Sequence, residues 1–323
     1  GQGGNVTVNV ADISVSGVGT QSFLPSGIYA STVGPGNAGN LTINTDRLSV
    51  GAGGRIDSST VASGNAGSVT VNATESIDLQ GTVPGSINPS LIISSAKDVD
   101  PAFKFLLESF GVAPIPKVQS GASGYVTNNT PTLRIDDGAE ATARNDGTGD
   151  AGTLTANTNS LYLDNGASIT ASTQQGSGGN LLINAREALL LRRDSQISAE
   201  AGGLGNGGNI TINALNLVAT ENSDIIANAV QGSGGTIQVN ARGIFGTQFR
   251  EQLTPESDIT ASSQFGLSGV VAIENPETTP AASLLALPSD VADSSDQIVA
   301  GCSSAQSSQF VATGRGGLPL APS

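Results

Sequence analysis

The chain has 323 residues, a formal net charge of −14, 43 glycines and only 3% aromatic residues. The scarcity of Lys and Arg argues against nucleic-acid binding and against attachment to an anionic membrane surface, because both need clustered cations. The low aromatic content indicates a thin core of Val, Ile, Leu and Ala, and no apolar run is long enough for membrane insertion.

A short phrase recurs along the chain from its first residues. It reads GGNVTVN at 3–9, GGNITIN at 207–213 and GGTIQVN at 234–240. The second glycine of each copy stands at positions 4, 39, 67, 124, 152, 179, 208 and 235, so the successive steps are 35, 28, 57, 28, 27, 29 and 27. A period of this size predicts a solenoid, in which the longest step is two coils, one of them carrying an insertion.

Each copy of the phrase predicts a β-strand with one buried face. The residue two positions after the second glycine is always aliphatic, and a polar residue, usually threonine, follows it, as in Val6, Thr7 and Val8. This alternation has the period of two that a half-buried strand requires. The residue five positions after the second glycine is always asparagine. These residues are Asn9, Asn44, Asn72, Asn129, Asn157, Asn184, Asn213 and Asn240.

Two further alternating segments follow in each repeat. One begins about ten residues after the second glycine, as in LYLD from Leu161, and the other about seventeen residues after it, as in SITAS from Ser168. Turn-forming Gly, Asn, Ser and Asp separate the segments. The third segment has a small residue at its second inward position, as a narrow corner of a triangular coil requires. These residues are Ser58, Ala143, Ala171, Ala199, Ala227 and Ala261.

Three short strands per coil and no helix between them predict an all-β fold, a parallel β-helix over residues 1–275. Stacked coils place equivalent positions about 4.8 Å apart, so the eight asparagines are expected to form a ladder of amide hydrogen bonds. One coil cannot bury its own apolar face, so stability resides in the array. The common steps are not multiples of six and do not suit the hexapeptides of a left-handed β-helix, and a leucine-rich repeat would need a return segment that is missing.

An insertion at 97–120 interrupts the array and predicts one short helix, Pro101–Phe110. Asp100 is a helix cap and Pro101 suits the first helical position. Its apolar face consists of Phe103, Leu106, Leu107 and Phe110. The helix is interpreted as packing against the array. The alternative is a protrusion that binds a partner, with contact residues Phe103, Phe105, Leu107 and Phe110.

The period fails after residue 275. Residues 276–289 form a linker rich in Pro, Thr and Ser, and residues 290–323 form an irregular tail. The single cysteine, Cys302, excludes an intrachain disulfide and leaves an anchoring role or none. Because the chain has no methionine and begins inside the repeat pattern, it is expected to be a piece of a longer protein.

The acidic residues are the candidates for catalysis, because the chain has no histidine to act as a general base. Glycoside hydrolysis needs two carboxylates at a defined separation. The segments that carry these acids, DDG, NDGTGD and LDNGA, are typical of turns. The basic pair in LRRDS at 191–195 is interpreted as a solvated strand end, and no cofactor or metal is expected. The candidate carboxylates are Asp136, Asp137, Asp146, Asp150, Asp164 and Asp194.

The repeats together with the C-terminal segments resemble a known family. The repeat units are followed by ITASSQFGLSGVVAIENPE and by IVAGCSSAQSSQFVATGRGGLP. This combination is similar to the C-terminal part of large cyanobacterial exoproteins of the filamentous haemagglutinin type, the secreted partners of two-partner secretion. The resemblance covers nearly the whole chain. The family's N-terminal secretion domain, which engages the outer-membrane transporter, is absent from these residues.

The resemblance implies a right-handed parallel β-helix, export across the outer membrane and a structural or adhesive role at the cell surface. It implies no binding residue, and it leaves open whether the receptor is a host cell, a glycan or another surface. Because β-helices also carry polysaccharide lyases and glycoside hydrolases, the fold does not decide function. A polysaccharide-active enzyme therefore stays as the alternative. A carboxylate cluster beside long loops would favour it, and flat faces with Asn and Thr ladders would favour the rod.

Overall fold

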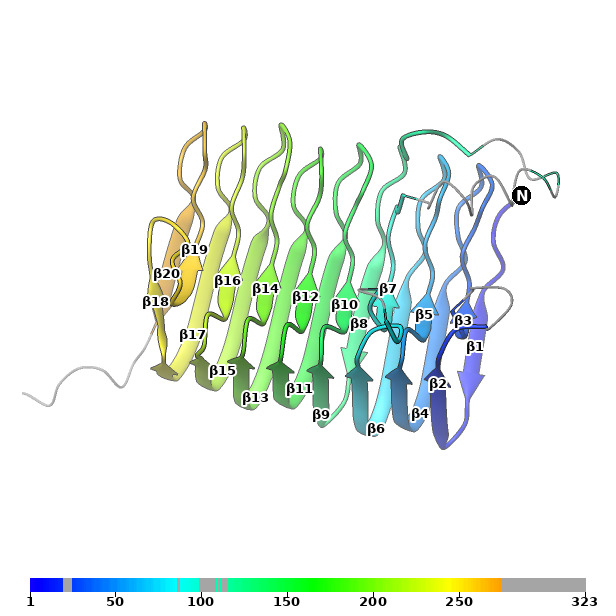
Figure 1. The fold of residues 1–323 in the computed structure, drawn as a ribbon, viewed down its shortest axis with the longest axis horizontal. Helices are drawn as coiled ribbons and strands as arrows, with labels where there is room; N and C mark the ends of the chain where they lie inside the picture. Colours follow the sequence, from blue (N-terminus) through cyan, green and yellow to red (C-terminus); the bar gives the residue numbers. More distant parts are fainter. Residues whose placement is uncertain (20–24, 86–87, 99–108, 110, 112–114, 275–323) are drawn as a thin grey trace, which may run out of the picture. The chain divides into compact units, whose positions relative to one another are not determined.

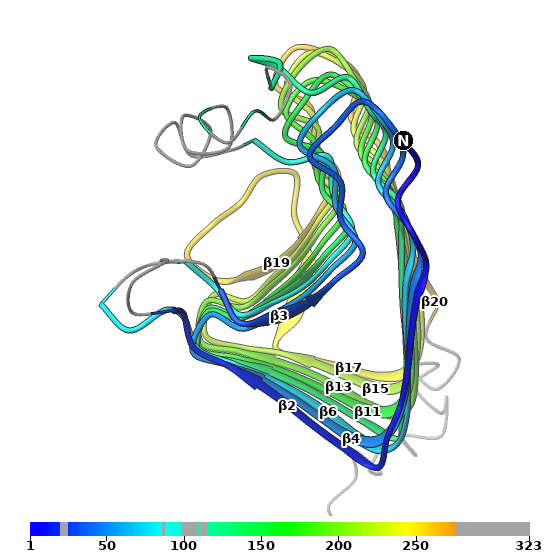
Figure 2. The ribbon, with the colours of Figure 1, turned by 90° about the vertical axis from the view of Figure 1, so that its right-hand side faces the viewer.

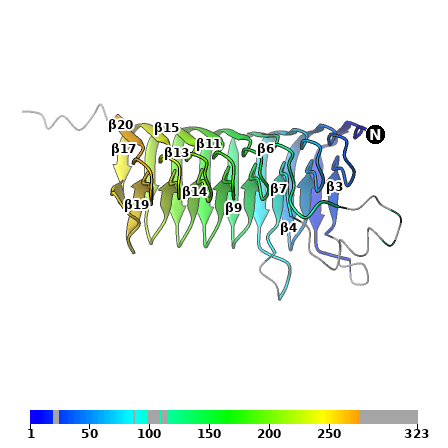
Figure 3. The same cartoon turned by 90° about the horizontal axis from the view of Figure 1, so that it is seen from above.

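The computed structural model describes residues 1–19, 25–85, 88–98, 109, 111 and 115–274. Its elements are β-strands, which form two parallel sheets. Figure 1 shows successive coils side by side, each repeating the same elements, and the view from above in Figure 3 shows them as one continuous row. The predicted all-β parallel β-helix is confirmed. The prediction that the longest step of the repeat is two coils is wrong: this step is one coil with an insertion, because Asn72 pairs directly with Asn129.

The larger sheet contains the first and second segments of each repeat. Its strands pair in register from coil to coil, so that Val6 lies beside Leu41 and Leu41 beside Val69. The strands are β1 (Val6–Asn9), β2 (Asp12–Ser16), β4 (Leu41–Gly51), β6 (Val69–Gln80), β8 (Tyr125–Asn129), β9 (Thr132–Asp136), β11 (Thr153–Asp164), β13 (Asn180–Arg192), β15 (Asn209–Ala219), β17 (Thr236–Phe245) and β20 (Val270–Glu274).

The smaller sheet contains the third segment of each repeat and one added strand, Thr247–Phe249, before the last third segment. Most of its strands are three residues long, because each has a single inward side chain before the chain turns. The strands are β3 (Gly27–Tyr29), β5 (Arg55–Asp57), β7 (Leu91–Ile93), β10 (Glu140–Thr142), β12 (Ser168–Thr170), β14 (Gln196–Ser198), β16 (Asp224–Ile226), β18 (Thr247–Phe249) and β19 (Ser257–Thr260).

The structure has two sheets, because the first two of the three strands predicted in each coil are joined in most coils. In most coils the first two segments are one long strand that bends just after the asparagine, with a register shift such as the one between Thr158 and Ser160. The Thr158 hydroxyl donates hydrogen bonds to the carbonyl oxygens of Ser160 and Pro131, both at 2.9 Å, and so satisfies backbone groups at the bend. β8 and β9 remain separate strands around Pro131, which has no N–H to donate.

The coils turn in a right-handed sense. Figure 2 views the array from the side of the chain's N-terminus. The long strands run down one straight side, bend at a corner and continue along a second side, and the short strands return along a third side that is set inward. This path is clockwise as the chain recedes, which is the hand expected for connections between parallel strands.

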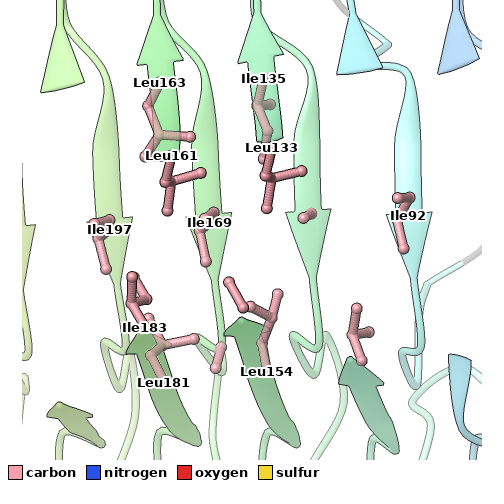
Figure 4. Close-up of a cluster of buried hydrophobic side chains, with 14 of the residues drawn as sticks. Ile92, Leu133, Ile135, Leu154, Leu161, Leu163, Ile169, Leu181, Ile183 and Ile197 are labelled. Carbon is pink, nitrogen blue, oxygen red and sulfur yellow. The ribbon is translucent and has the colours of Figure 1, made fainter. Parts of the chain in front are cut away.

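The core is a set of stacked aliphatic columns enclosed by the two sheets. Figure 4 shows these side chains converging on the interior from both sheets. Leu161, Leu181 and Ile169 are fully or almost fully buried, and the equivalent positions of neighbouring coils are also aliphatic. Burial of each such side chain contributes about 1.5–3 kcal/mol.

One core position is occupied by a polar residue. Asn128 is completely buried between Val71 and Ala156, and its amide nitrogen and oxygen have no hydrogen-bond partner among the described residues. Because an unpaired buried amide is costly, we expect Asn128→Val to raise the free energy of unfolding by about 1 kcal/mol in urea melts. Thr127→Val, on the outward side, should change it by less than about 0.5 kcal/mol. A destabilised Asn128→Val variant would contradict this account.

The corner after each short strand packs tightly, as the small residues there predict. Ala171 is fully buried, and its carbonyl oxygen accepts a hydrogen bond of 2.7 Å from the N–H of Gly179, the second glycine of the next copy of the repeated phrase. The same contact joins Ala199 to Gly208 at 2.7 Å. The glycine of the repeated phrase therefore lies where two passes of the backbone meet.

Apart from Ser109, the predicted helix at Pro101–Phe110 lies outside the described residues, and so do residues 276–289, residues 290–323 and Cys302. The chain divides into two units, Gly1–Thr278 and Thr279–Ser323.

Candidate functional site

The eight predicted asparagines occupy one register position, at the end of the first segment of each repeat, and form what we call the asparagine column. From Asn44 onward, the side-chain Nδ2 of each donates to Oδ1 of the asparagine in the preceding coil. The distance is 2.7 Å from Asn44 to Asn9 and 2.8 Å for the six pairs that follow, up to Asn240 and Asn213. These are all seven of the bonds that eight stacked amides can make along the column.

A shallow recess of about 960 Å³ borders the asparagine column. It arises because the bend is one residue shorter after Asn129 and Asn157 than after Asn72 and Asn184. Ser76, Thr132, Ser160 and Ala188 share one register position although they follow their asparagines by four, three, three and four residues. The recess therefore spans two coils and presents amides, hydroxyls and a proline ring, with Arg186 at its edge. Such a lining can bind polar groups but holds no acid–base pair.

The candidate carboxylates lie apart from this recess. Asp136 and Asp164 share one register position at the ends of β9 and β11. Burial raises the pKa of Asp136, Arg134 lowers it, and the carboxylates of Asp164 and Asp137 raise it again, with a net increase. An acid with a raised pKa beside a second carboxylate is a combination that glycosidases use. Here the carboxylate of Asp164 is already paired with Arg193, because Arg193 Nε lies 2.7 Å from Asp164 Oδ1.

Asp137 lies in the turn after β9, as the DDG segment predicts, and Asp194 lies in the turn after β13. Both have left-handed backbone conformations, with φ of 56° and 59°. Their carboxylates accept hydrogen bonds from the amides of Asn165 and Asn222 in the following coil, at 2.7 and 2.8 Å. Asp side chains tolerate this conformation, so the turn geometry accounts for both residues.

The remaining candidates have structural partners. Asp146 pairs with the guanidinium of Arg144 at 3.2 Å, and Asp150 accepts a hydrogen bond of 2.8 Å from the backbone of Ser177. The basic pair lies at the end of β13, where Arg192 pairs with Glu221 at 3.1 Å. In the described part of the chain, no three His, Cys, Asp or Glu side chains are grouped to hold a metal ion.

The outward side of the short strands carries buried carboxylates that the sequence analysis missed. Asp57 and Asp258 are completely buried, and each pairs with a cation from an insertion. Lys97 Nζ lies 2.5 Å from Asp57, and Arg250 pairs with Asp258. Alternation predicts solvent exposure at these positions, so only the path of the covering loops, one of which Figure 2 shows over β19, makes them buried.

A similar pairing occurs in the middle of the array. Glu140, at 7% exposed, accepts hydrogen bonds from Arg144 at 3.1 Å and from the Thr170 hydroxyl at 2.5 Å. Each of these three buried carboxylates thus has hydrogen-bond or ion-pair partners within the fold. This fits a role in holding the loops in place. None of the three is free to act as a catalytic acid or base.

The stability of the Asp57 pairing should depend on pH. Burial raises the pKa of Asp57, but the charge and hydrogen bond of Lys97 and the hydrogen bonds of Ser59 and Ser31 lower it by more. A carboxyl whose pKa is lowered by folding stabilises the protein above its unfolded pKa, about 3.9, and loses this contribution as the pH falls through the folded value. We expect wild type to exceed Asp57→Asn in unfolding free energy at pH 7 and the difference to shrink below about pH 4.

Glu200 supplies the control with the opposite sign. Burial raises its pKa, which the Ser198 hydrogen bond only partly offsets. The folded state therefore binds this proton more tightly, so ionised Glu200 destabilises the protein at pH 7 and the effect disappears as the pH falls below about 4.3. Glu200→Gln should be more stable than wild type at pH 7, with a gap that closes on acidification. For both variants, a difference in unfolding free energy from wild type that does not change with pH would refute the pKa shifts of Asp57 and Glu200.

The proposed contact residues of the insertion, Phe103, Phe105, Leu107 and Phe110, lie outside the described residues. Comparison of the chain with protein-family models, curated proteins and solved structures gives no significant match. Among the described residues, no helix is both long and apolar enough to cross a membrane.

Proposed function

We propose that this protein is a structural or adhesive rod of the filamentous haemagglutinin type, secreted and presented at the cell surface. The observation that carries the proposal is the asparagine column, whose seven hydrogen bonds run without a break from the first coil to the eighth. In a solenoid each coil contacts only its neighbours, so length is gained by adding coils. A stack of coils joined by the same hydrogen bond at each coil suits a protein that extends over a long distance.

The resemblance of the repeats and the C-terminal segments supplies the route and the partners of this proposal. Export is by two-partner secretion, through an outer-membrane transporter that binds a domain outside these residues. The receptor is a host cell, a glycan or another surface. No cofactor is part of the proposal.

The proposal is tested in the bacterium that makes the protein. Intact cells are labelled with an antibody to the array, in wild type and in a strain without the neighbouring transporter gene. We expect labelling and attachment to surfaces in wild type and the loss of both in the transporter mutant. Antigen that stays inside the outer membrane in wild-type cells would refute the proposal.

A polysaccharide-active enzyme is the second candidate, and the pairing of Asp136 with Asp164 is the observation that favours it. Because Arg193 occupies Asp164, we expect no activity. Incubation with pectin, alginate and bacterial polysaccharides should release no reducing or unsaturated ends. Turnover that disappears in Asp136→Asn and persists in Asp150→Asn would establish the enzyme instead.

A further inference from the structure

One side of the array presents uncharged and mostly polar side chains in every coil. It is formed by the outward residues of the first segments of the long strands, and we call it the threonine face. Thr7, Thr42, Thr70, Thr127 and Thr155 are consecutive in register along its middle. Leu182, Thr211 and Gln238 continue this line. The asparagine column borders it on one side.

The threonine face carries no charge. The eight copies of the repeated phrase that form it, from 3–9 to 234–240, contain no Asp, Glu, Lys or Arg, although the chain has 27 acidic and 13 basic residues. The second side of the long strands differs, because it carries ion pairs such as Arg47 with Asp12 and Glu75. With a net charge of −14, two copies would repel one another least when they meet through the uncharged face.

The hydroxyls of this face are free to bind a partner. Within the described residues no hydrogen bond involves the side chains of Thr7, Thr42, Thr70, Thr127 or Thr155. The amides of the asparagine column, by contrast, are already bonded to one another. Figure 2 shows the first segments aligned along one straight side, with the loop 250–256 on the other side of the array. The threonine face is therefore flat, and the loop 250–256 does not cover it.

We propose that the threonine face is an interface between two copies of this chain. In-register sheets with identical side chains in every strand pack face to face as dry, interdigitated layers, and low charge favours such packing. Eight strands at about 4.8 Å spacing and about six residues per strand give a face of roughly 40 Å by 20 Å. This is on the order of 800 Å² per copy, which is the area that a stable interface buries per partner.

The inference does not depend on the proposed surface role, because pairing is a property of the array. A competing surface lies on the second side, where Tyr162, Leu190, Val218 and Phe245 form an apolar line in register, and Phe245 is 57% exposed. That line covers four coils, and the same register position holds Asp78 and Arg134 in the two preceding coils. The threonine face is uncharged along its whole length, which is why we assign the interface to it.

Sedimentation of the full chain tests the proposal. We expect wild type to dimerise and the double variant Thr127→Arg/Thr155→Arg to dissociate with at least a tenfold higher Kd, because it places like charges opposite one another. Leu190→Arg/Val218→Arg is the matched control, with two arginines on adjacent coils of the second side, and should dimerise like wild type. Circular dichroism verifies the fold, and the single variant Thr155→Lys replaces the double variant if the latter fails to fold.

Three results would overturn the assignment. The first is a wild-type chain that stays monomeric at all concentrations. The second is loss of the dimer in the Leu190→Arg/Val218→Arg variant alone, which would move the interface to the apolar line. The third is a monomer whose binding to a neutral polysaccharide such as cellulose is abolished by Thr127→Arg/Thr155→Arg, which would make the face a glycan-binding surface.

Discussion

Gly179→Ala is expected to lower the free energy of unfolding by about 3 kcal/mol, at the upper end of the range for overpacked interiors. A Cβ added at Gly179 would overlap the carbonyl oxygen of Gly152 in the preceding coil and lie 3.0 Å from Cβ of Ala171. The overlapped atoms belong to backbone that is hydrogen-bonded on both sides, so the coils cannot yield locally. The effect is measured by urea melts followed by circular dichroism.

Gly4→Ala is the matched control, because Gly4 occupies the same position of the first described coil. A Cβ there would meet nothing within 4 Å. We expect a change of less than about 0.5 kcal/mol, as for a surface substitution. Equal losses in Gly4→Ala and Gly179→Ala would show that the penalty does not come from the stacking of coils.

Asn184→Ala is expected to lower the free energy of unfolding by about 2 kcal/mol, because it leaves polar groups on two neighbouring coils unpaired. The Asn184 amide donates to Asn157 and accepts from Asn213, each at 2.8 Å. The substitution removes both hydrogen bonds and leaves an acceptor on one neighbour and a donor on the other without a partner. Each such group costs about 1–3 kcal/mol when buried and less when partly exposed, as these are. Urea melts of the single variant measure the loss.

Asn9→Ala provides the comparison, because Asn9 has only the bond from Asn44. A model of nearest-neighbour coupling predicts about half the loss seen for Asn184→Ala. If the two variants were equally destabilised, or if neither were destabilised, the asparagine column would not contribute to stability in the way its geometry indicates.

The sequence predicts the array well because the same constraint acts in every coil. The second glycine, the aliphatic positions and the asparagine each recur. A pattern that arises by chance in one repeat can therefore be recognised, because the other repeats lack it. The small residues Ala171 and Ala199 are predictable for the same reason, since the corner they fill has the same size each time.

What the sequence does not predict is set by contacts that occur once. The burial of Asp57 and Asp258 depends on Lys97 and Arg250, which reach them from insertions of different length and position. The recess beside Pro131 arises from a one-residue difference between bends, which the spacing of the repeats does not reveal. The union of the first two segments into one strand was missed because polar residues at a bend resemble a turn.

The asparagine column has a direction. Every bond in it runs from a donor nitrogen in the later coil to an acceptor oxygen in the earlier one. A chain that emerges from its N-terminus onward would therefore always present an acceptor to the coil that comes next, and each coil would template its successor. Beside Asn240 the next residue in register is Glu274, whose side chain has no amide N–H to donate. The amide oxygen of Asn240 therefore faces a second acceptor in place of a donor. The series of amide hydrogen bonds ends at this coil for a chemical reason.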